Sequence, residues 1–69
     1  MEKRIQQVLG ENIRAIHEAS GLSKVDFALQ LGISRVELDV IEDGRANPKL
    51  LTLNQIARNL GKEAWELIK

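Results

Sequence analysis

Residues 23–42 read SKVDFALQLGISRVELDVIE and contain the start signals of two helices. Ser23 and Ser34 are favourable N-cap residues, because a serine hydroxyl accepts a hydrogen bond from a backbone amide of the first helical turn. Each serine is followed three residues later by an acidic residue, and the glutamate that follows Ser34 can complete a capping box. Gly32 ends the first helix just before the second begins. The stretch therefore predicts two short helices joined by a tight turn.

Apolar residues occupy the inner face of both predicted helices. They are Phe27, Ala28 and Leu31 in the first helix and Leu38 and Ile41 in the second. Ala28 allows the two helices to approach closely, because its side chain is small. A short helix, a tight turn that contains glycine and a second helix set across the first form a helix-turn-helix, whose second helix inserts into a major groove of DNA.

The flanking segments show helical periodicity as well. Before residue 23, apolar residues recur at three- and four-residue spacing up to a stop at Gly21, at Ile5, Val8, Leu9, Ile13 and Ile16. After the loop 45–48, a further helix ends at Gly61 and has a predicted buried stripe of Leu50, Leu53, Ile56, Ala57 and Leu60. Residues 62–68 read as a short fifth helix. We expect a single all-α domain of five helices over residues 1–69.

The charge balance argues against strong binding to a polyanion. The chain has 69 residues, of which 10 are basic and 10 are acidic, so its formal net charge is zero. A neutral balance is unusual for a protein that neutralises DNA phosphates.

Several functional classes are excluded by the residues that are missing. The sequence has no cysteine and one histidine, which rules out a disulfide framework and a zinc cage. No Ser/His/Asp or Cys/His set can be assembled either. We therefore expect no enzymatic activity, no catalytic residue, no metal and no cofactor. No apolar run approaches the length of a membrane span, and Met1 leads directly into charged residues without a signal peptide, so we expect a cytoplasmic protein that does not contact a membrane.

Six short motifs in one order resemble the repressor/Cro family of helix-turn-helix proteins known as XRE. They are Gly21-Leu22-Ser23, Phe27-Ala28, Leu31-Gly32-Ile33-Ser34, Ile41-Glu42-Asp43-Gly44, Asn47-Pro48 and Leu60-Gly61. The resemblance extends from about Leu9 to Ile68. It implies a lambda-repressor-like DNA-binding domain of bacterial or phage type, associated with the nucleoid, with a recognition helix over about residues 34–42.

The resemblance also implies which residues face the bases. Arg35 is the strongest candidate for a bidentate contact to guanine. Val36 and Val40 can pack against thymine methyl groups, although both can also be ordinary apolar surface residues. The remaining expected base contacts are nearby, at Ser34, Glu37 and Asp39.

Phosphate contacts in this family come from the start of the second helix and from the loop after the third. Here these positions are Lys24, Arg45, Asn47 and Lys49. The alternative is that the lysines are simply solvated. The sequence departs from the family pattern because acidic residues crowd the third helix and its end, at Glu37, Asp39, Glu42 and Asp43. Carboxylates that face phosphates repel them, so we expect weak nonspecific binding.

One of these acidic residues has a structural partner in the family. The glutamate at the position of Glu42 commonly pairs with an arginine of the first helix, and in this sequence that position is His17. We therefore expect a contact between His17 and Glu42, with an exposed His17 as the alternative.

Four positions that are usually polar in this family are apolar here. Leu51 and Trp65 fall where relatives form two-fold dimer contacts, although Trp65 can instead cover the small core. Val25 and Leu29 lie one turn apart on the second helix and offer a surface for another protein. The sequence thus favours a repressor-like regulator that binds double-stranded DNA sequence-specifically as a homodimer. The alternative is a protein–protein interaction module on the same fold that has lost DNA binding.

Overall fold

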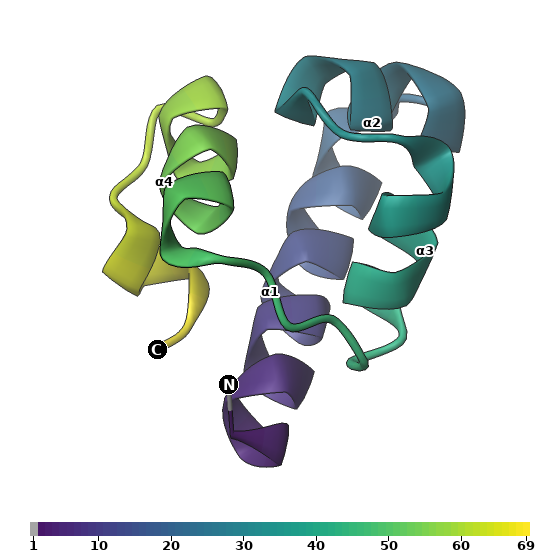
Figure 1. The fold of residues 1–69 in the computed structure, drawn as a ribbon. Coiled ribbons are helices and arrows are strands. Elements are labelled where there is room, and N and C mark those ends of the chain that lie inside the picture. Colours follow the sequence, from purple (N-terminus) through teal and green to yellow (C-terminus); the bar gives the residue numbers. More distant parts are fainter. Residues whose placement is uncertain (1) are drawn as a thin grey trace.

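The computed structural model describes residues 2–69, and in that range the chain is helical without a strand. Figure 1 shows the arrangement of its elements. In chain order they are the α-helices α1 (Lys3–Ser20), α2 (Lys24–Leu31), α3 (Arg35–Glu42) and α4 (Leu50–Asn59) and the 3₁₀ helix η1 (Ala64–Leu67). None of these helices is long and apolar enough to cross a membrane.

Helix α1 is the longest element of the fold. Helices α2 and α3 pack against it and against each other, and α4 packs against α2 and η1 (Figure 1). The chain after α4 turns back so that η1 also contacts α1. Every helix contributes to a single core, whose buried members are Leu9, Ile13, Phe27, Ala28, Leu31, Leu38, Ile41, Leu53, Ile56, Ala57 and Leu67. Removal of this apolar surface from water is the main stabilising contribution to folding.

The predicted helix boundaries are confirmed at α2 and α3. The Ser23 hydroxyl accepts a hydrogen bond from the backbone N–H of Asp26 at 3.1 Å. At the start of α3 the Ser34 hydroxyl accepts from the backbone N–H of Glu37 at 3.0 Å, and the Glu37 carboxylate accepts from the N–H of Ser34 at 3.0 Å. This capping box satisfies two backbone donors that an isolated helix end leaves without a partner.

The predicted count of five helices is not confirmed, because residues 2–69 contain four α-helices and the element after α4 is a 3₁₀ helix. The segment 62–68 forms only the 3₁₀ turn Ala64–Leu67, because the backbone is left-handed at Gly61, extended at Glu63 and outside the helical region again at Ile68. Tertiary contacts hold this turn in place. Leu67 is fully buried, and its carbonyl accepts a hydrogen bond from Asn12 Nδ2 of α1 at 2.8 Å.

The predicted buried stripe of α4 is wrong at its first residue. Leu50 is 71% exposed, whereas Leu53, Ile56 and Ala57 are buried and Leu60 packs against the core. The elements that α4 contacts, α2 and η1, leave the side chain of Leu50 uncovered. Helical spacing alone places Leu50 in register with the buried face but does not show where that face ends.

Candidate nucleic-acid interface

The turn between α2 and α3 is closed by backbone hydrogen bonds. Gly32 has a φ of 76°, a left-handed conformation that glycine adopts at no steric cost. The N–H of Gly32 donates to the carbonyl of Leu29 at 3.1 Å, and the N–H of Ile33 donates to the carbonyl of Ala28 at 3.1 Å. Because Ser34 then caps α3 at once, the second helix starts in a defined direction relative to the first.

The two faces of α3 differ in character. Leu38 and Ile41 are buried against the rest of the domain. On the outer face, Arg35 is exposed, Val36 is 71% exposed and Val40 is half-buried. Val36 and Val40 are four residues apart and therefore lie on the same side of the helix. The outer face thus offers one guanidinium and two apolar side chains to a partner.

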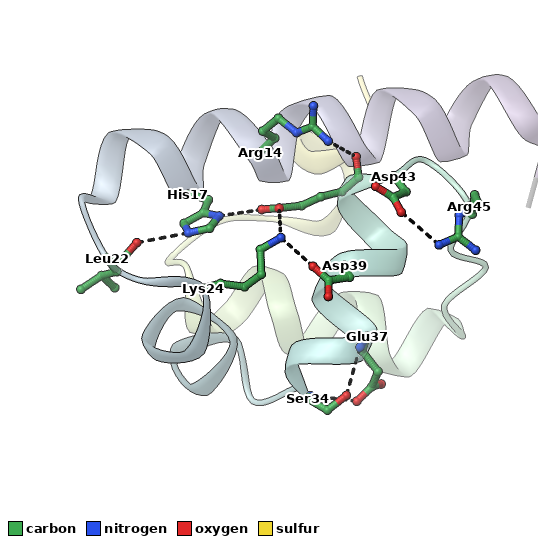
Figure 2. A network of polar contacts seen from close by, with 10 residues as sticks. Arg14, His17, Leu22, Lys24, Ser34, Glu37, Asp39, Asp43 and Arg45 are labelled. Atoms are coloured by element: carbon green, nitrogen blue, oxygen red, sulfur yellow. Dashed lines mark hydrogen bonds and ion pairs between the residues drawn. The ribbon is translucent and has the colours of Figure 1, made fainter.

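The carboxylate of Asp39 is directed toward α2 (Figure 2). Its Oδ1 lies 2.6 Å from Nζ of Lys24. The hydrogen bond from Lys24 holds the pKa of Asp39 below its usual 3.8. The same hydrogen bond raises the pKa of Lys24 above its usual 10.5. A predicted base contact and a predicted phosphate contact are therefore ion-paired with each other.

The side chain of Glu42, at the end of α3, contacts residues of α1 and α2. Its side chain is only 6% exposed, and its carboxylate lies 2.8 Å from Nδ1 of His17 on α1 and 3.4 Å from Nζ of Lys24 on α2. Its backbone carbonyl accepts a hydrogen bond from Nη2 of Arg14 at 2.9 Å (Figure 2). The structure thus brings together the predicted pair of His17 and Glu42 and adds Lys24 and Arg14 to it.

His17 is enclosed rather than exposed. Its side chain is 16% exposed, and its ring stacks on that of Phe27 with the ring centroids 4.6 Å apart and the planes 5° from parallel. The other ring nitrogen, Nε2, lies 3.2 Å from the carbonyl oxygen of Leu22. Stacking on Phe27 holds the plane of the imidazole ring, with Nδ1 directed toward Glu42.

The other two acidic residues near α3 also have partners. The Glu37 carboxylate belongs to the capping box at Ser34. Asp43 accepts a hydrogen bond from Nη2 of Arg45 at 3.0 Å, and both side chains are more than half exposed. Each of the four carboxylates that the sequence places on α3 or at its end therefore contacts a donor within the domain.

The loop between α3 and α4 forms one wall of a groove beside the outer face of α3. Val36 and Val40 line the groove from α3, and Pro48, Lys49 and Thr52 line it from the loop and from α4. Asn47 and Arg45 border it as well. Lys49 is exposed at the start of α4. This groove had no signal in the sequence, because its two walls come from separate elements.

The four apolar positions that are unusual for the family are all exposed. Val25 and Leu29 on α2 are 59% and 77% exposed, and Leu51 on α4 is 80% exposed. Trp65 is 59% exposed, with Nζ of Lys69 5.0 Å from the centre of its ring. The residue of that segment that is buried in the core is Leu67, whereas more than half of Trp65 is exposed.

Two short helices, joined by a tight turn at a glycine and followed by a free outer face on the second, define a helix-turn-helix protein. A family model described as a helix-turn-helix domain matches residues 10–69. The chain belongs to this family, the XRE-type helix-turn-helix transcriptional regulators, which are not enzymes.

Individual relatives agree with this assignment. The chain is 30% identical over 64 residues to an uncharacterized HTH-type transcriptional regulator, y4dJ, of Sinorhizobium fredii. These residues make up 93% of this chain and 83% of the relative. Over 54 residues the chain is 35% identical to an uncharacterized HTH-type transcriptional regulator of Methanothermobacter thermautotrophicus, with 78% of each chain covered. The crystal structure of the hypothetical transcription factor NHTF from Neisseria superposes with a TM-score of 0.82 and 27% identity, over 100% of this chain and 80% of that one.

Proposed function

We propose that this chain binds double-stranded DNA sequence-specifically, with α3 in the major groove, and that it acts as a repressor. The observation that carries the proposal is the separation of charges on α3. Arg35, Val36 and Val40 lie on the outer face, whereas the carboxylates of Asp39 and Glu42 are directed to partners on α1 and α2. Internal pairing removes much of the repulsion that the acidic sequence of α3 implies for DNA.

Arg35 and Ser34 are the polar side chains that we assign to base edges. An arginine in the major groove donates two hydrogen bonds to O6 and N7 of guanine, which is the commonest specific contact of this kind. We assign Glu37 and Asp39 to positioning rather than to direct base contact. Glu37 holds the first turn of α3, and Asp39 holds Lys24.

Phosphate contacts are assigned to Lys49, Asn47, Arg45 and Lys24. Lys49 contributes most, because Arg45 and Lys24 are already ion-paired with Asp43 and Asp39. Lys24 can bind a phosphate only by competition with Asp39. With a net charge of zero, the chain has little attraction for DNA of arbitrary sequence, and its binding depends on base contacts.

Selection from a randomised duplex pool at low and moderate salt tests the proposal. We expect enriched half-sites and an affinity that falls as salt rises. Arg35→Ala relaxes the preference at one base position, Lys49→Ala weakens binding to all sequences alike, and Lys62→Ala, beyond the far end of α4, changes neither. Failure to retain any duplex at low salt contradicts the proposal and favours a protein–protein interaction module.

We further propose that the chain binds its operator as a homodimer through Leu51 and Trp65. Both side chains are large, apolar and exposed, and a two-fold dimer places two recognition helices about 34–36 Å apart on one face of the duplex. Val25 and Leu29 form a second exposed apolar surface, which we assign to an additional protein partner. Light scattering with and without operator tests the dimer. We expect a 2:1 protein-to-operator complex that Trp65→Ala weakens.

A further inference from the structure

The buried carboxylate of Glu42 has two nitrogen partners, and one of them is also assigned to DNA. Its Oε2 lies 2.8 Å from Nδ1 of His17, and its Oε1 lies 3.4 Å from Nζ of Lys24 (Figure 2). The side chain of Glu42 has little access to water, and a buried charge is unfavourable unless it is paired. Because lysine is positively charged at neutral pH, Lys24 neutralises Glu42 as long as the two side chains stay together.

Lys24 is the member of this cluster that can leave it. Its side chain is 37% exposed, whereas the side chains of His17 and Glu42 are both enclosed. A DNA phosphate that draws the ammonium outward separates it from Asp39 as well as from Glu42. Asp39 is 42% exposed, so water can solvate its carboxylate after the separation. Glu42 is left with His17 as its remaining side-chain partner among the residues that the structure describes.

His17 can replace the lost positive charge by taking up a proton from solvent. Its Nδ1 faces Glu42, and its Nε2 lies 3.2 Å from the carbonyl oxygen of Leu22. An imidazolium donates from both nitrogens and satisfies both acceptors, whereas a neutral imidazole has one N–H only. Of the other neighbours, Phe27 stacks on the ring, and Arg14 donates to the backbone carbonyl of Glu42.

We propose that DNA binding is coupled to the uptake of one proton by the pair of His17 and Glu42, because a phosphate removes Lys24 from Glu42. The inference rests on the proposed function, since it needs Lys24 at a phosphate. In the free domain Lys24 holds the positive charge beside Glu42, and in the complex the imidazolium of His17 holds it. A complex that contains one more proton is favoured by a lower pH, so operator affinity is higher in mildly acidic than in mildly alkaline solution.

Operator affinity measured from about pH 6 to about pH 8 at constant ionic strength tests the coupling. Uptake of a whole proton changes affinity about tenfold per pH unit, and an unperturbed imidazole titrates at about pH 6.5, within this range. We expect the affinity of the wild type to rise about three- to tenfold from pH 8 to pH 6. His17→Gln keeps an N–H donor but does not titrate, so its affinity is independent of pH.

Lys24→Met separates the coupling from simple attraction between a charged histidine and DNA. Methionine keeps the length of the lysine side chain but removes the ammonium. Glu42 then depends on His17 with and without DNA, so operator affinity no longer varies with pH. The pH dependence passes to the unfolding free energy of the free domain, which is higher at pH 6 than at pH 8. Lys62→Met, at an exposed lysine beyond α4, is the matched control and keeps the wild-type pH dependence of affinity.

Calorimetric titration of the wild type with operator counts the protons without any variant. In buffers of different ionisation enthalpy, we expect uptake of part of one proton at about pH 7. Zero uptake, or an operator affinity that is constant with pH, overturns the coupling and leaves sequence-specific DNA binding intact. A pH dependence of affinity that persists in folded His17→Gln or Lys24→Met also overturns it, and circular dichroism verifies folding. A chain that retains no duplex at all overturns both proposals together.

Discussion

The structure pairs Asp39 with Lys24, a contact that the sequence does not indicate. Each belongs to a position that faces DNA according to the family pattern, yet the two contact each other at 2.6 Å. The pair joins α2 to α3 and lies beside the Glu42 carboxylate, which is 3.4 Å from the same lysine nitrogen. At the scale of single residues, the acidic character of α3 is therefore largely structural.

The pKa shifts of this pair predict a pH-dependent contribution to stability. The pKa of Asp39 is lowered below 3.8 by the hydrogen bond from Lys24, so its contribution is full above pH 3.8 and is lost as the pH falls through the folded-state value. The pKa of Lys24 is raised above 10.5, so its contribution is full below pH 10.5 and is lost as the pH rises through the folded-state value.

Urea denaturation of the wild type and of Asp39→Asn over a range of pH measures this contribution. We expect the wild type to be the more stable of the two by a constant amount at about pH 5–9, and the difference to shrink below pH 3.8. Glu18→Gln, a change at an exposed carboxylate of α1, serves as the control. A difference that grows toward acid pH contradicts the assignment.

At the scale of elements, the contact between α1 and the end of α3 depends on Gly10. A Cβ atom at this position would lie 2.5 Å from the carbonyl oxygen of Ile41 and 3.1 Å from the backbone nitrogen of Gly44. Real Cβ atoms essentially never show the shorter of these two distances. Gly10 is buried in the middle of α1, where glycine is unfavourable for helix formation, so its benefit lies in the close approach of the two helices.

Gly10→Ala tests this close approach. Forcing a methyl group into a packed contact costs about 1–3 kcal/mol, whereas alanine gains only about 0.5–1 kcal/mol over glycine inside a helix. We expect the midpoint of thermal unfolding to fall by about 5–10 °C, since about 1 kcal/mol shifts it by about 4–8 °C in a domain of this size. Glu11→Ala, at the exposed neighbouring position, should change it by no more than about 2 °C. An increase for Gly10→Ala would show that α1 and α3 can separate freely.

At the scale of the whole molecule, the domain is small and its core is closed by the last turn of the chain. Leu67 of η1 is fully buried, and Asn12 of α1 holds the backbone of that turn. Native domains are stable by about 0.05–0.15 kcal/mol per residue, which for a chain of 69 residues is about 3–10 kcal/mol in total. A single large cavity can therefore remove most of its stability.

Leu67→Ala and Trp65→Ala compare a buried and an exposed residue of the same turn. Leu67→Ala is expected to lose about 2–5 kcal/mol of unfolding free energy and to be largely unfolded at 37 °C. Trp65→Ala, at a side chain that is 59% exposed, should lose less than about 1 kcal/mol. Urea denaturation at the lowest workable protein concentration excludes a contribution from self-association. Equal losses in the two variants would mean that Trp65 covers the core after all.

The helices, their caps and most of the core followed from the sequence alone. The two serine caps, the glycine stop at Gly32 and the buried faces of α2 and α3 all depend on residues within one or two turns of each other. Local spacing and backbone preference determine such features before any tertiary contact forms. The family motifs follow the same local pattern, which is why they identified the helix-turn-helix.

The partners of the charged groups and the ends of the apolar faces required the tertiary structure. Lys24 and Asp39 are 15 residues apart, and His17 and Glu42 are 25 apart, so local sequence patterns indicate neither contact. The family resemblance suggested only the contact between His17 and Glu42. The exposure of Leu50, the 3₁₀ turn that ends in Leu67 and the groove beside α3 likewise depend on which element lies opposite. Sequence periodicity shows which face of a helix is apolar, but only the packing of neighbouring helices determines how much of that face is covered.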